Sequence, residues 1–311
     1  MYFKNIKGQE FAKKYMINAI EREQVNHAYM FEGLEGIGKE TFASELVKIL
    51  LETPHLENAT DCIRIKPHGN SIKIAQIRGL QSDIIIKPHK KYKIYIIDKA
   101  EKMTIEAQNA LLKTLEEPPK YAIIILVTNN KESLLPTIKS RCEVIKFTPI
   151  PFVEVKDYLI TQGVEENRAN LLATFSRGSM KKALELSSSN DFYEIKESVQ
   201  NYIETILSKN MVKILDIPSE MERYKSNSIT VLDMMISYFR DIMMCKERVD
   251  KNMIINVDRV VFIQNISSEI TYSQLSKIID IIEDTKIKIK GNCNFSLSIQ
   301  VMSLNIYEVI K

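Results

Sequence analysis

Short apolar runs alternate with amphipathic stretches over the first 148 residues of the chain. Several of these runs are nearly continuous in β-branched or aromatic residues, which is typical of strands buried on both faces of a parallel sheet. The pattern predicts strands at residues 27–31, 62–65, 93–97, 121–127 and 143–147. Helical periodicity between them predicts helices at residues 41–51, 75–85 and 104–116, and a short one that ends near Ser140. This alternation predicts a doubly wound α/β domain with a parallel sheet at residues 1–148.

Pro149 and Pro151 end that alternation, and most of the remaining chain has helical periodicity. The apolar spacing predicts short helices at residues 153–162, 165–176 and 179–186, and longer ones at 229–245, 272–288 and 295–310. The polar stretch 187–190 is interpreted as a linker. We therefore expect a small helical domain at residues 149–190 and a helical C-terminal domain at residues 191–311.

Composition and charge exclude several classes of protein. The 43 basic and 40 acidic residues leave a net charge of +3, so strong nucleic-acid binding through a concentrated basic patch is not indicated. The sequence has no CxxC pair, which excludes a zinc ribbon or redox motif of that kind; its cysteines are Cys62, Cys142, Cys245 and Cys293. No apolar run approaches the roughly 18 residues that would span a bilayer. The N-terminus has no apolar signal core, so a cytoplasmic location is expected.

A glycine-rich loop follows the first predicted strand and opens a helix. Its sequence, GLEGIGK from Gly33 to Lys39, matches the pattern G-x-x-x-x-G-K. Gly33, Gly36 and Gly38 allow backbone N–H groups to curl round a phosphate, and the helix N-terminus adds its positive dipole. Lys39 would reach the outer phosphates. The strand–loop–helix context therefore predicts a phosphate loop of the kind that holds ATP or ADP.

The residue after Lys39 departs from the pattern that magnesium binding requires. A Ser or Thr hydroxyl normally binds the metal at this position, but the residue here is Glu40. Thr41 follows, and one helical residue turns its side chain by about 100°. Glu40 has the chemistry to ligate magnesium itself, yet it adds negative charge beside a triphosphate. Whether ATP, ADP or magnesium binds is left open, and a loop kept only for its shape is the alternative.

Asp98 directly follows the third predicted strand, where an aspartate holds the metal in this kind of fold. In hydrolysing proteins of this fold the next residue is a glutamate that activates water. Here it is Lys99, and a protonated ammonium is not a general base at neutral pH. Glu101 is a poor substitute because it belongs to the following loop. We therefore expect that the chain does not hydrolyse ATP in its own site.

Several blocks resemble the clamp-loader subunits of bacterial DNA polymerase III, which are AAA+ proteins. The blocks cover about residues 3–186 and are FxxIxGQE from Phe3, HAYMFEG from His27, SIKIxQIR from Ser71, AxNALLKTLEEPP from Ala107 and LLPTIxSRC from Leu134. The resemblance implies a P-loop AAA+ domain with a doubly wound parallel sheet, a small helical lid domain, and a helical collar domain that joins an oligomer.

The resemblance also implies roles for single residues. Arg141 belongs to the motif whose arginine reaches the γ-phosphate of ATP on a neighbouring subunit, as arginine fingers do. The alternative is a surface arginine in a salt bridge. Thr128, or Asn129 beside it, falls at the polar sensor position. Lys181 lies where a sensing arginine is usual, and lysine cannot copy its bidentate grip.

Relatives often carry a four-cysteine zinc module, but the interval 52–61 is too short for one, so no zinc is expected.

The departures from the family pattern at Glu40, Lys99 and Lys181, together with the missing zinc module, favour a delta-prime type of stator over the hydrolysing subunit. The implied partners are gamma/tau-type ATPase subunits and a delta subunit. The sliding clamp and primer-template DNA would be reached through this hetero-oligomer, without a membrane. The alternatives are the hydrolysing clamp-loader subunit, another active AAA+ motor, and a P-loop kinase of small molecules.

Overall fold

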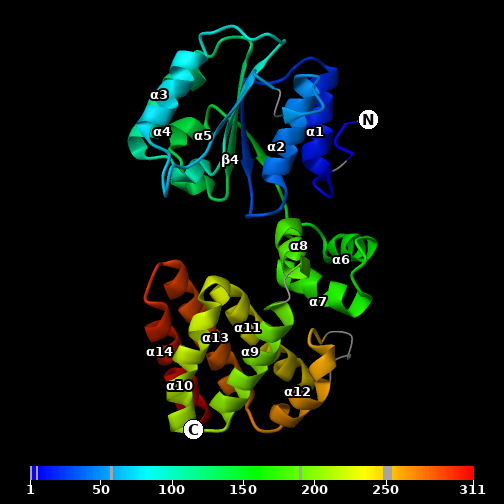
Figure 1. The fold of residues 1–311 in the computed structure, drawn as a ribbon, viewed down its shortest axis with the longest axis vertical. Helices are drawn as coiled ribbons and strands as arrows, with labels where there is room; N and C mark the ends of the chain where they lie inside the picture. The colour runs from blue at the N-terminus through cyan, green and yellow to red at the C-terminus, as the bar shows by residue number, and fades with distance from the viewer. Residues whose placement is uncertain (1, 5, 57–58, 189–190, 248–253) are drawn as a thin grey trace. The chain divides into compact units, whose positions relative to one another are not determined.

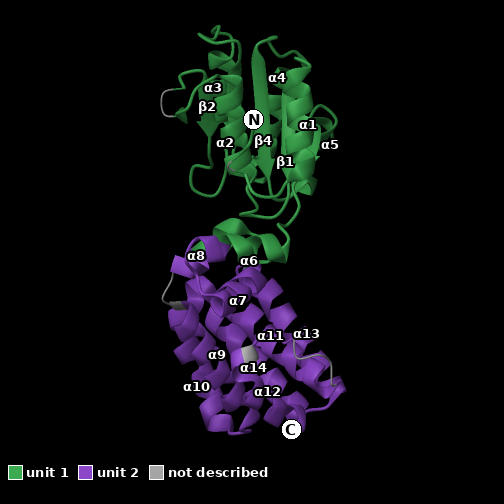
Figure 2. Cartoon of the chain, turned by 90° about the vertical axis from the view of Figure 1, so that its right-hand side faces the viewer, with its two compact units in different colours: residues 1–158, 176–184 green, residues 159–175, 185–311 purple. Residues whose placement is uncertain are grey.

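The computed structural model describes residues 2–4, 6–56, 59–188, 191–247 and 254–311. The chain divides into two compact units (Figure 2). The first contains residues 1–158 and 176–184, and the second contains residues 159–175 and 185–311. The domain boundaries predicted at residues 148 and 190 stay a prediction.

The first unit is built on a five-stranded parallel sheet with the order β2-β3-β4-β1-β5. The strands are β1 (Ala28–Glu32), β2 (Cys62–Ile65), β3 (Lys93–Ile97), β4 (Ala122–Thr128) and β5 (Glu143–Lys146). All the predicted strands are confirmed, with ends that differ by at most one residue. Every residue of β3 and β4 is buried, because helices cover both faces of a parallel sheet.

Helices cover the two faces of this sheet (Figure 1). One face packs against α1 (Glu10–Glu21) and α2 (Lys39–Leu50). The other packs against α3 (Ile74–Asp83), α4 (Ile105–Glu116) and α5 (Pro136–Lys139). Side chains alternate between the faces along β1, since Phe31 joins the first cluster and Met30 the second. Short 3₁₀ turns, η2 (Ala100–Lys102) and η3 (Lys131–Ser133), follow β3 and β4.

The ends of α4 show how local sequence fixes a helix. The Thr104 hydroxyl accepts a hydrogen bond from the Ala107 backbone N–H and caps the first turn. Pro118 and Pro119 follow Glu116 and forbid continuation. The predicted helices are confirmed, with ends within two residues. The structure adds α1 and the helices Asp191–Leu207, Met211–Met221 and Val260–Ser267.

The remaining elements are helical. They are α6 (Phe152–Thr161), α7 (Glu166–Ser176), α8 (Met180–Ser188), α9 (Asp191–Leu207), α10 (Met211–Met221), η4 (Glu222–Asn227), α11 (Ser228–Lys246), η6 (Val257–Arg259), α12 (Val260–Ser267), α13 (Tyr272–Lys290) and α14 (Phe295–Ile310). Within the second unit α11 packs against α9, α12 and α13, and α14 packs against α10 and α13. The predicted linker at 187–190 is wrong at Ser187 and Ser188, which continue α8, while residues 189–190 lie outside the described part of the chain.

Candidate functional site

The glycine-rich loop joins β1 to α2, and its glycines adopt backbone angles that L side chains rarely take. Gly36 has φ +78° and Gly38, which precedes the first residue of α2, has φ +100°. A Cβ atom on Gly33, at φ +156°, would lie 2.5 Å from the Phe147 carbonyl oxygen. A Cβ on Gly36 would clash with the Ser179 hydroxyl. The spacing of the glycines is therefore set by both backbone conformation and close packing.

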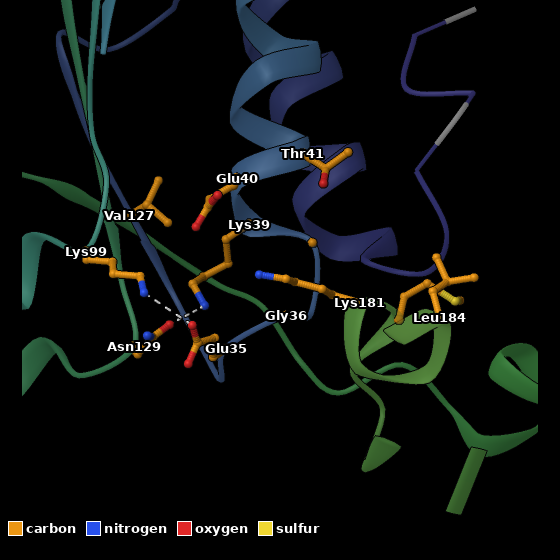
Figure 3. A pocket seen from close by; sticks show the side chains of 12 residues that line it. Glu35, Gly36, Lys39, Glu40, Thr41, Lys99, Val127, Asn129, Lys181 and Leu184 are labelled. Atoms are coloured by element: carbon orange, nitrogen blue, oxygen red, sulfur yellow. Dashed lines mark hydrogen bonds and ion pairs between the residues drawn. The ribbon is translucent and has the colours of Figure 1, made fainter. Parts of the chain in front are cut away.

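The loop borders a cavity of about 370 Å³ (Figure 3). Its lining comes from the loop, from the first turn of α2, from the ends of β3 and β4, and from the first turns of α8. The residues are Glu35, Gly36, Gly38, Lys39, Glu40, Thr41, Lys99, Val127, Asn129, Met180, Lys181 and Leu184. The fold thus brings together most of the predicted nucleotide-site residues. The predicted residues that are not among those lining the cavity are Gly33, Asp98, Thr128 and Arg141.

Lys39 is held inside the loop rather than extended into the cavity. Its ammonium group donates hydrogen bonds to the carbonyl oxygens of Gly33 at 2.7 Å and Leu34 at 2.5 Å, and to Asn129 Oδ1 at 2.9 Å. These contacts use all the donors of an ammonium group. Lys39 is only 4% exposed, and this burial lowers its pKa to about 8, against the opposing charges of nearby glutamates. A phosphate would have to displace one of these oxygens to bind Lys39 directly.

Glu40 and Thr41 lie in the first turn of α2, and both are exposed. Figure 3 shows the Glu40 side chain on the side of the helix that faces Val127 and Lys99, whereas the Thr41 side chain points in another direction. This is the separation expected from the rotation of one helical residue. A carboxylate therefore takes the position that a metal-binding hydroxyl occupies in a phosphate loop of this kind.

Asn129, and not Thr128, presents the polar side chain at the end of β4. Thr128 is 1% exposed, and its hydroxyl accepts a hydrogen bond from the Asn130 backbone N–H. Asn129 lines the cavity and contacts Lys39. Its own backbone N–H donates to Glu101 Oε2 at 3.2 Å, so Glu101 fixes the segment that holds Asn129.

Asp98 lies directly after β3 and is 3% exposed. Its carboxylate forms an ion pair with Arg64 of β2, with 3.4 Å between Asp98 Oδ2 and Arg64 Nε. Lys99 turns the chain at φ 52° and extends to Glu35 Oε1, 3.4 Å from its Nζ (Figure 3). Sequence reasoning missed Arg64, and its one signal was a basic residue inside the strand that pairs with β3.

Arg141 lies between α5 and β5, on a segment outside the cavity lining. Its Nη2 is 2.7 Å from Glu116 Oε1, and its Nη1 donates to the Thr137 carbonyl oxygen at 3.0 Å. The side chain is 34% exposed. Arg141 therefore forms a salt bridge with Glu116 in the isolated chain, which was the alternative to its role as an arginine finger.

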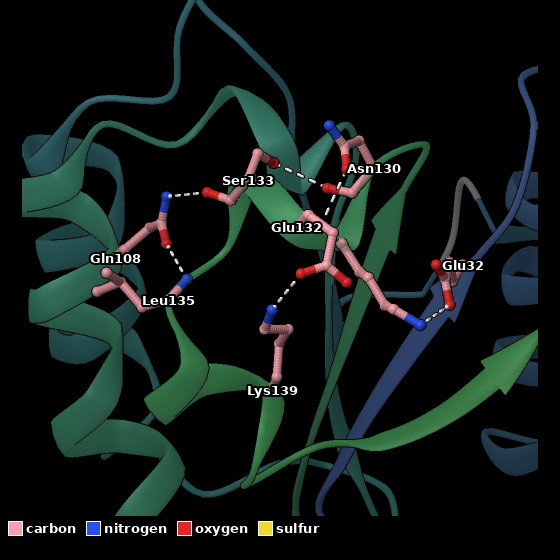
Figure 4. Close-up of polar contacts among 8 residues, drawn as sticks. Glu32, Gln108, Asn130, Glu132, Ser133, Leu135 and Lys139 are labelled. Atoms are coloured by element: carbon pink, nitrogen blue, oxygen red, sulfur yellow. Dashed lines mark hydrogen bonds and ion pairs between the residues drawn. The ribbon is translucent and has the colours of Figure 1, made fainter.

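Polar contacts tie the segment before Arg141 to α4 (Figure 4). The Gln108 amide donates to the Ser133 carbonyl oxygen at 3.2 Å and accepts from the Leu135 N–H at 2.8 Å. Lys139 Nζ lies 2.7 Å from Glu132 Oε2 across the same turn. These contacts fix the backbone that carries Arg141.

No helix in the described ranges combines the length and apolarity that crossing a membrane would take. Among the same residues, no three His, Cys, Asp or Glu side chains gather as a metal ion would require.

The sequence of the chain matches known proteins of one family. The family model described as "DNA polymerase III, delta subunit" matches residues 8–151, and that of its C-terminal part matches residues 191–306. The delta-prime subunit of DNA polymerase III from Bacillus subtilis is 34% identical over 251 residues, which cover 74% of this chain and 75% of that protein. The tau subunit from the same organism is 30% identical over 78% of this chain and 50% of its own length. A solved structure of a gamma subunit-related protein from Thermotoga maritima is 21% identical, with a TM-score of 0.49 over 97% of this chain and 99% of that one. The chain belongs to the family of DNA polymerase III clamp-loader subunits that includes delta-prime and gamma/tau.

Proposed function

We propose that the chain is a delta-prime-like stator subunit of a replicative clamp loader. It would assemble with gamma/tau-type ATPase subunits and a delta subunit, and would supply Arg141 to ATP bound by a neighbouring subunit. The observation that carries the proposal is the contrast between its two functional segments. Lys99 stands where the chain's own site needs a carboxylate, while Arg141 lies outside that site on a segment that Gln108 ties to α4.

The cis site supports a non-hydrolysing role. Lys99 replaces the carboxylate that would activate water, and it pairs with Glu35 instead. Glu101 accepts from the Asn129 backbone N–H, so the nearest alternative carboxylate already has a structural contact. The Lys39 ammonium group already donates hydrogen bonds to Gly33, Leu34 and Asn129. We propose that any ATP or ADP held here is not turned over, and that no zinc takes part.

The chemistry of Arg141 supports a role in trans. A guanidinium is permanently charged, and its forked donors match the charge that spreads over phosphoryl oxygens during transfer. Its side chain is partly exposed, so it can change partner without unfolding the segment. The sliding clamp and primer-template DNA would be contacted by the whole cytoplasmic complex, since a net charge of +3 gives this chain little attraction for DNA.

The test is a reconstituted complex that contains Arg141→Ala in an otherwise normal set of subunits. We expect normal assembly, and loss of fast hydrolysis at the one ATP site beside this chain, by about 10³-fold or more. Single-turnover measurement of DNA-stimulated ATP hydrolysis would report that loss. Arg78→Ala, which removes an exposed arginine of α3, is the matched control. An unchanged rate in the Arg141→Ala complex would refute the proposal.

The alternative is that the chain is itself an ATPase. The complete glycine pattern, the retained Lys39 and the 30% identity to tau favour it. The isolated chain separates the two functions, because magnesium-dependent ATP turnover that Lys39→Ala abolishes would support the alternative. The stator proposal predicts no such turnover.

A further inference from the structure

We propose that Arg64 takes the place of a divalent cation at Asp98, which makes this phosphate loop a metal-free site. The inference deepens the proposed function, because it assigns a physical cause to the absence of hydrolysis in cis. It concerns a residue that lies outside the glycine loop and outside the strand that carries Asp98.

The starting observation is the state of the Asp98 carboxylate. It is almost fully buried, and within the described part of the chain neither of its oxygens accepts a hydrogen bond. A buried carboxylate that lacks hydrogen bonds requires a nearby positive charge. In a metal-dependent site of this fold that charge is the magnesium ion.

Arg64 supplies the charge instead. It lies on β2 beside β3, so the two strands bring its side chain to the end of β3. Its Nε is 3.4 Å from Asp98 Oδ2, and its Nη2 donates to Ser44 Oγ on α2 at 2.8 Å. The Ser44 hydroxyl in turn donates to the Glu40 carbonyl oxygen at 2.8 Å. The guanidinium therefore links the end of β3 to the first turns of α2, which are the two elements that a metal would join.

The surrounding charges oppose a further cation. Burial raises the pKa of Asp98, and Arg64 is the largest influence that opposes this rise. The negative charge of Glu40 also raises the pKa of Asp98. Lys66 and Lys99 lower this pKa, as Arg64 does, because their positive charges stabilise the charged carboxylate. Three cations thus act on one carboxylate, with Glu40 as the opposing anion. A dication would meet this positive field, and the guanidinium does not deprotonate to relieve it.

The first test asks whether Arg64 and Asp98 are energetically coupled in the full chain. Arg64→Gln and Asp98→Asn are each expected to lower the Tm by roughly 4 °C or more. Arg64→Gln leaves the Asp98 carboxylate without its paired cation, and Asp98→Asn leaves the Arg64 guanidinium without its paired anion. The double variant is expected to lower the Tm by clearly less than the sum of the two shifts. Arg78→Gln, a change of the same type at an exposed site, is the control. Additive shifts would overturn the proposal.

The second test asks whether the guanidinium and a cation are interchangeable. The Tm of each variant is measured in excess MgCl2 and in NaCl of equal ionic strength with EDTA. We expect no difference for the parent chain, and a Mg²⁺-dependent recovery for Arg64→Gln that vanishes in the double variant with Asp98→Asn. A Mg²⁺ effect on the parent chain that Asp98→Asn removes would overturn the proposal, as would the absence of recovery in Arg64→Gln.

These tests use the isolated chain, whereas the test of Arg141 uses the assembled complex. If Arg64 and Asp98 prove uncoupled, the role of Arg141 in trans is unaffected. If the Arg141→Ala complex hydrolyses ATP normally, the pairing of Arg64 with Asp98 is unaffected. The two failures are therefore distinguishable.

Discussion

Arg141 Nη2 lies 2.7 Å from Glu116 Oε1, so the guanidinium rests against the last residue of α4. The two side chains are 34% and 49% exposed, and an ion pair this accessible to water is weak, about 0–1 kcal/mol. The contact orients Arg141 without fixing it. In the proposed role, Arg141 has to leave Glu116 in order to reach a phosphate on a neighbouring subunit.

Glu116→Gln is therefore expected to leave DNA-stimulated ATP hydrolysis by the complex unchanged or slightly faster, because it weakens the contact that competes for Arg141. The free energy of unfolding of the chain should change by less than about 1 kcal/mol. Single-turnover ATP hydrolysis in the reconstituted complex measures the first effect. Glu117→Gln, at the adjacent exposed position, is the control. A loss of rate as large as that of Arg141→Ala would mean that Glu116 holds Arg141 in its working position.

Gly36→Ala is expected to destabilise the chain more than Gly38→Ala. Both positions have positive φ, so both substitutions introduce backbone strain of about 1–3 kcal/mol. At Gly36 the new Cβ would also clash with the Ser179 hydroxyl and lie 3.3 Å from Lys181 Cβ, whereas at Gly38 it meets nothing within 4 Å. The difference between the two Tm values isolates the packing of α8 on the loop. Equal Tm values would contradict this expectation, because they would mean that Ser179 and Lys181 move aside from the new Cβ without a cost in stability.

The lowered pKa of Lys39 predicts a pH dependence with a definite sign. In the folded chain its pKa is about 8, and the ordinary pKa of a lysine, which applies to the unfolded chain, is 10.5. Between these values the unfolded state binds more protons, so the stability of the folded state rises with pH. The burial penalty is fully present below about pH 8 and is lost as the pH rises towards 10.5. Below both values this penalty on the charged form of Lys39 is constant.

Lys39→Met has no group that titrates there, so it provides the reference. We expect the Tm of the parent chain to rise relative to that of Lys39→Met as the pH increases from 8 to 10. All other side chains are common to the two proteins, so their contributions cancel in the comparison. A difference that stays constant over this range would contradict the buried, partly desolvated state of Lys39.

Asn256→Ala is expected to destabilise the second unit by about 1–3 kcal/mol. Asp241 is completely buried, and its carboxylate accepts from the backbone N–H groups of Ile255 and Asn256 and from Asn256 Nδ2 at 2.8 Å. The substitution removes one donor from a buried charge. Urea denaturation measures the effect, with Asn265→Ala at an exposed position of α12 as the control. Equal midpoints for the two variants would contradict it.

The strands and the departures from an active site could both be predicted from the sequence. The buried strands are nearly continuous apolar runs, and a run of this kind can be recognised from consecutive residues alone. Glu40 and Lys99 are likewise identified by their positions relative to a loop and a strand. At Ser187 the same reasoning failed, because a polar composition suggested a linker where the helix continues.

The contacts that define the candidate site were decided only by the tertiary structure. Lys39 meets Asn129, Asp98 meets Arg64, and Arg141 meets Glu116, and each pair joins elements that are not consecutive in the sequence. Periodicity reports which positions are apolar, but it does not report which strands lie side by side. The sequence by itself thus determined the parallel α/β fold and the glycine loop. It also determined that Glu40 and Lys99 stand where an active site needs a hydroxyl and a glutamate. The strand order brought Arg64 to Asp98 and turned Asn129 rather than Thr128 towards Lys39, because polar partners are set by the packing of distant segments.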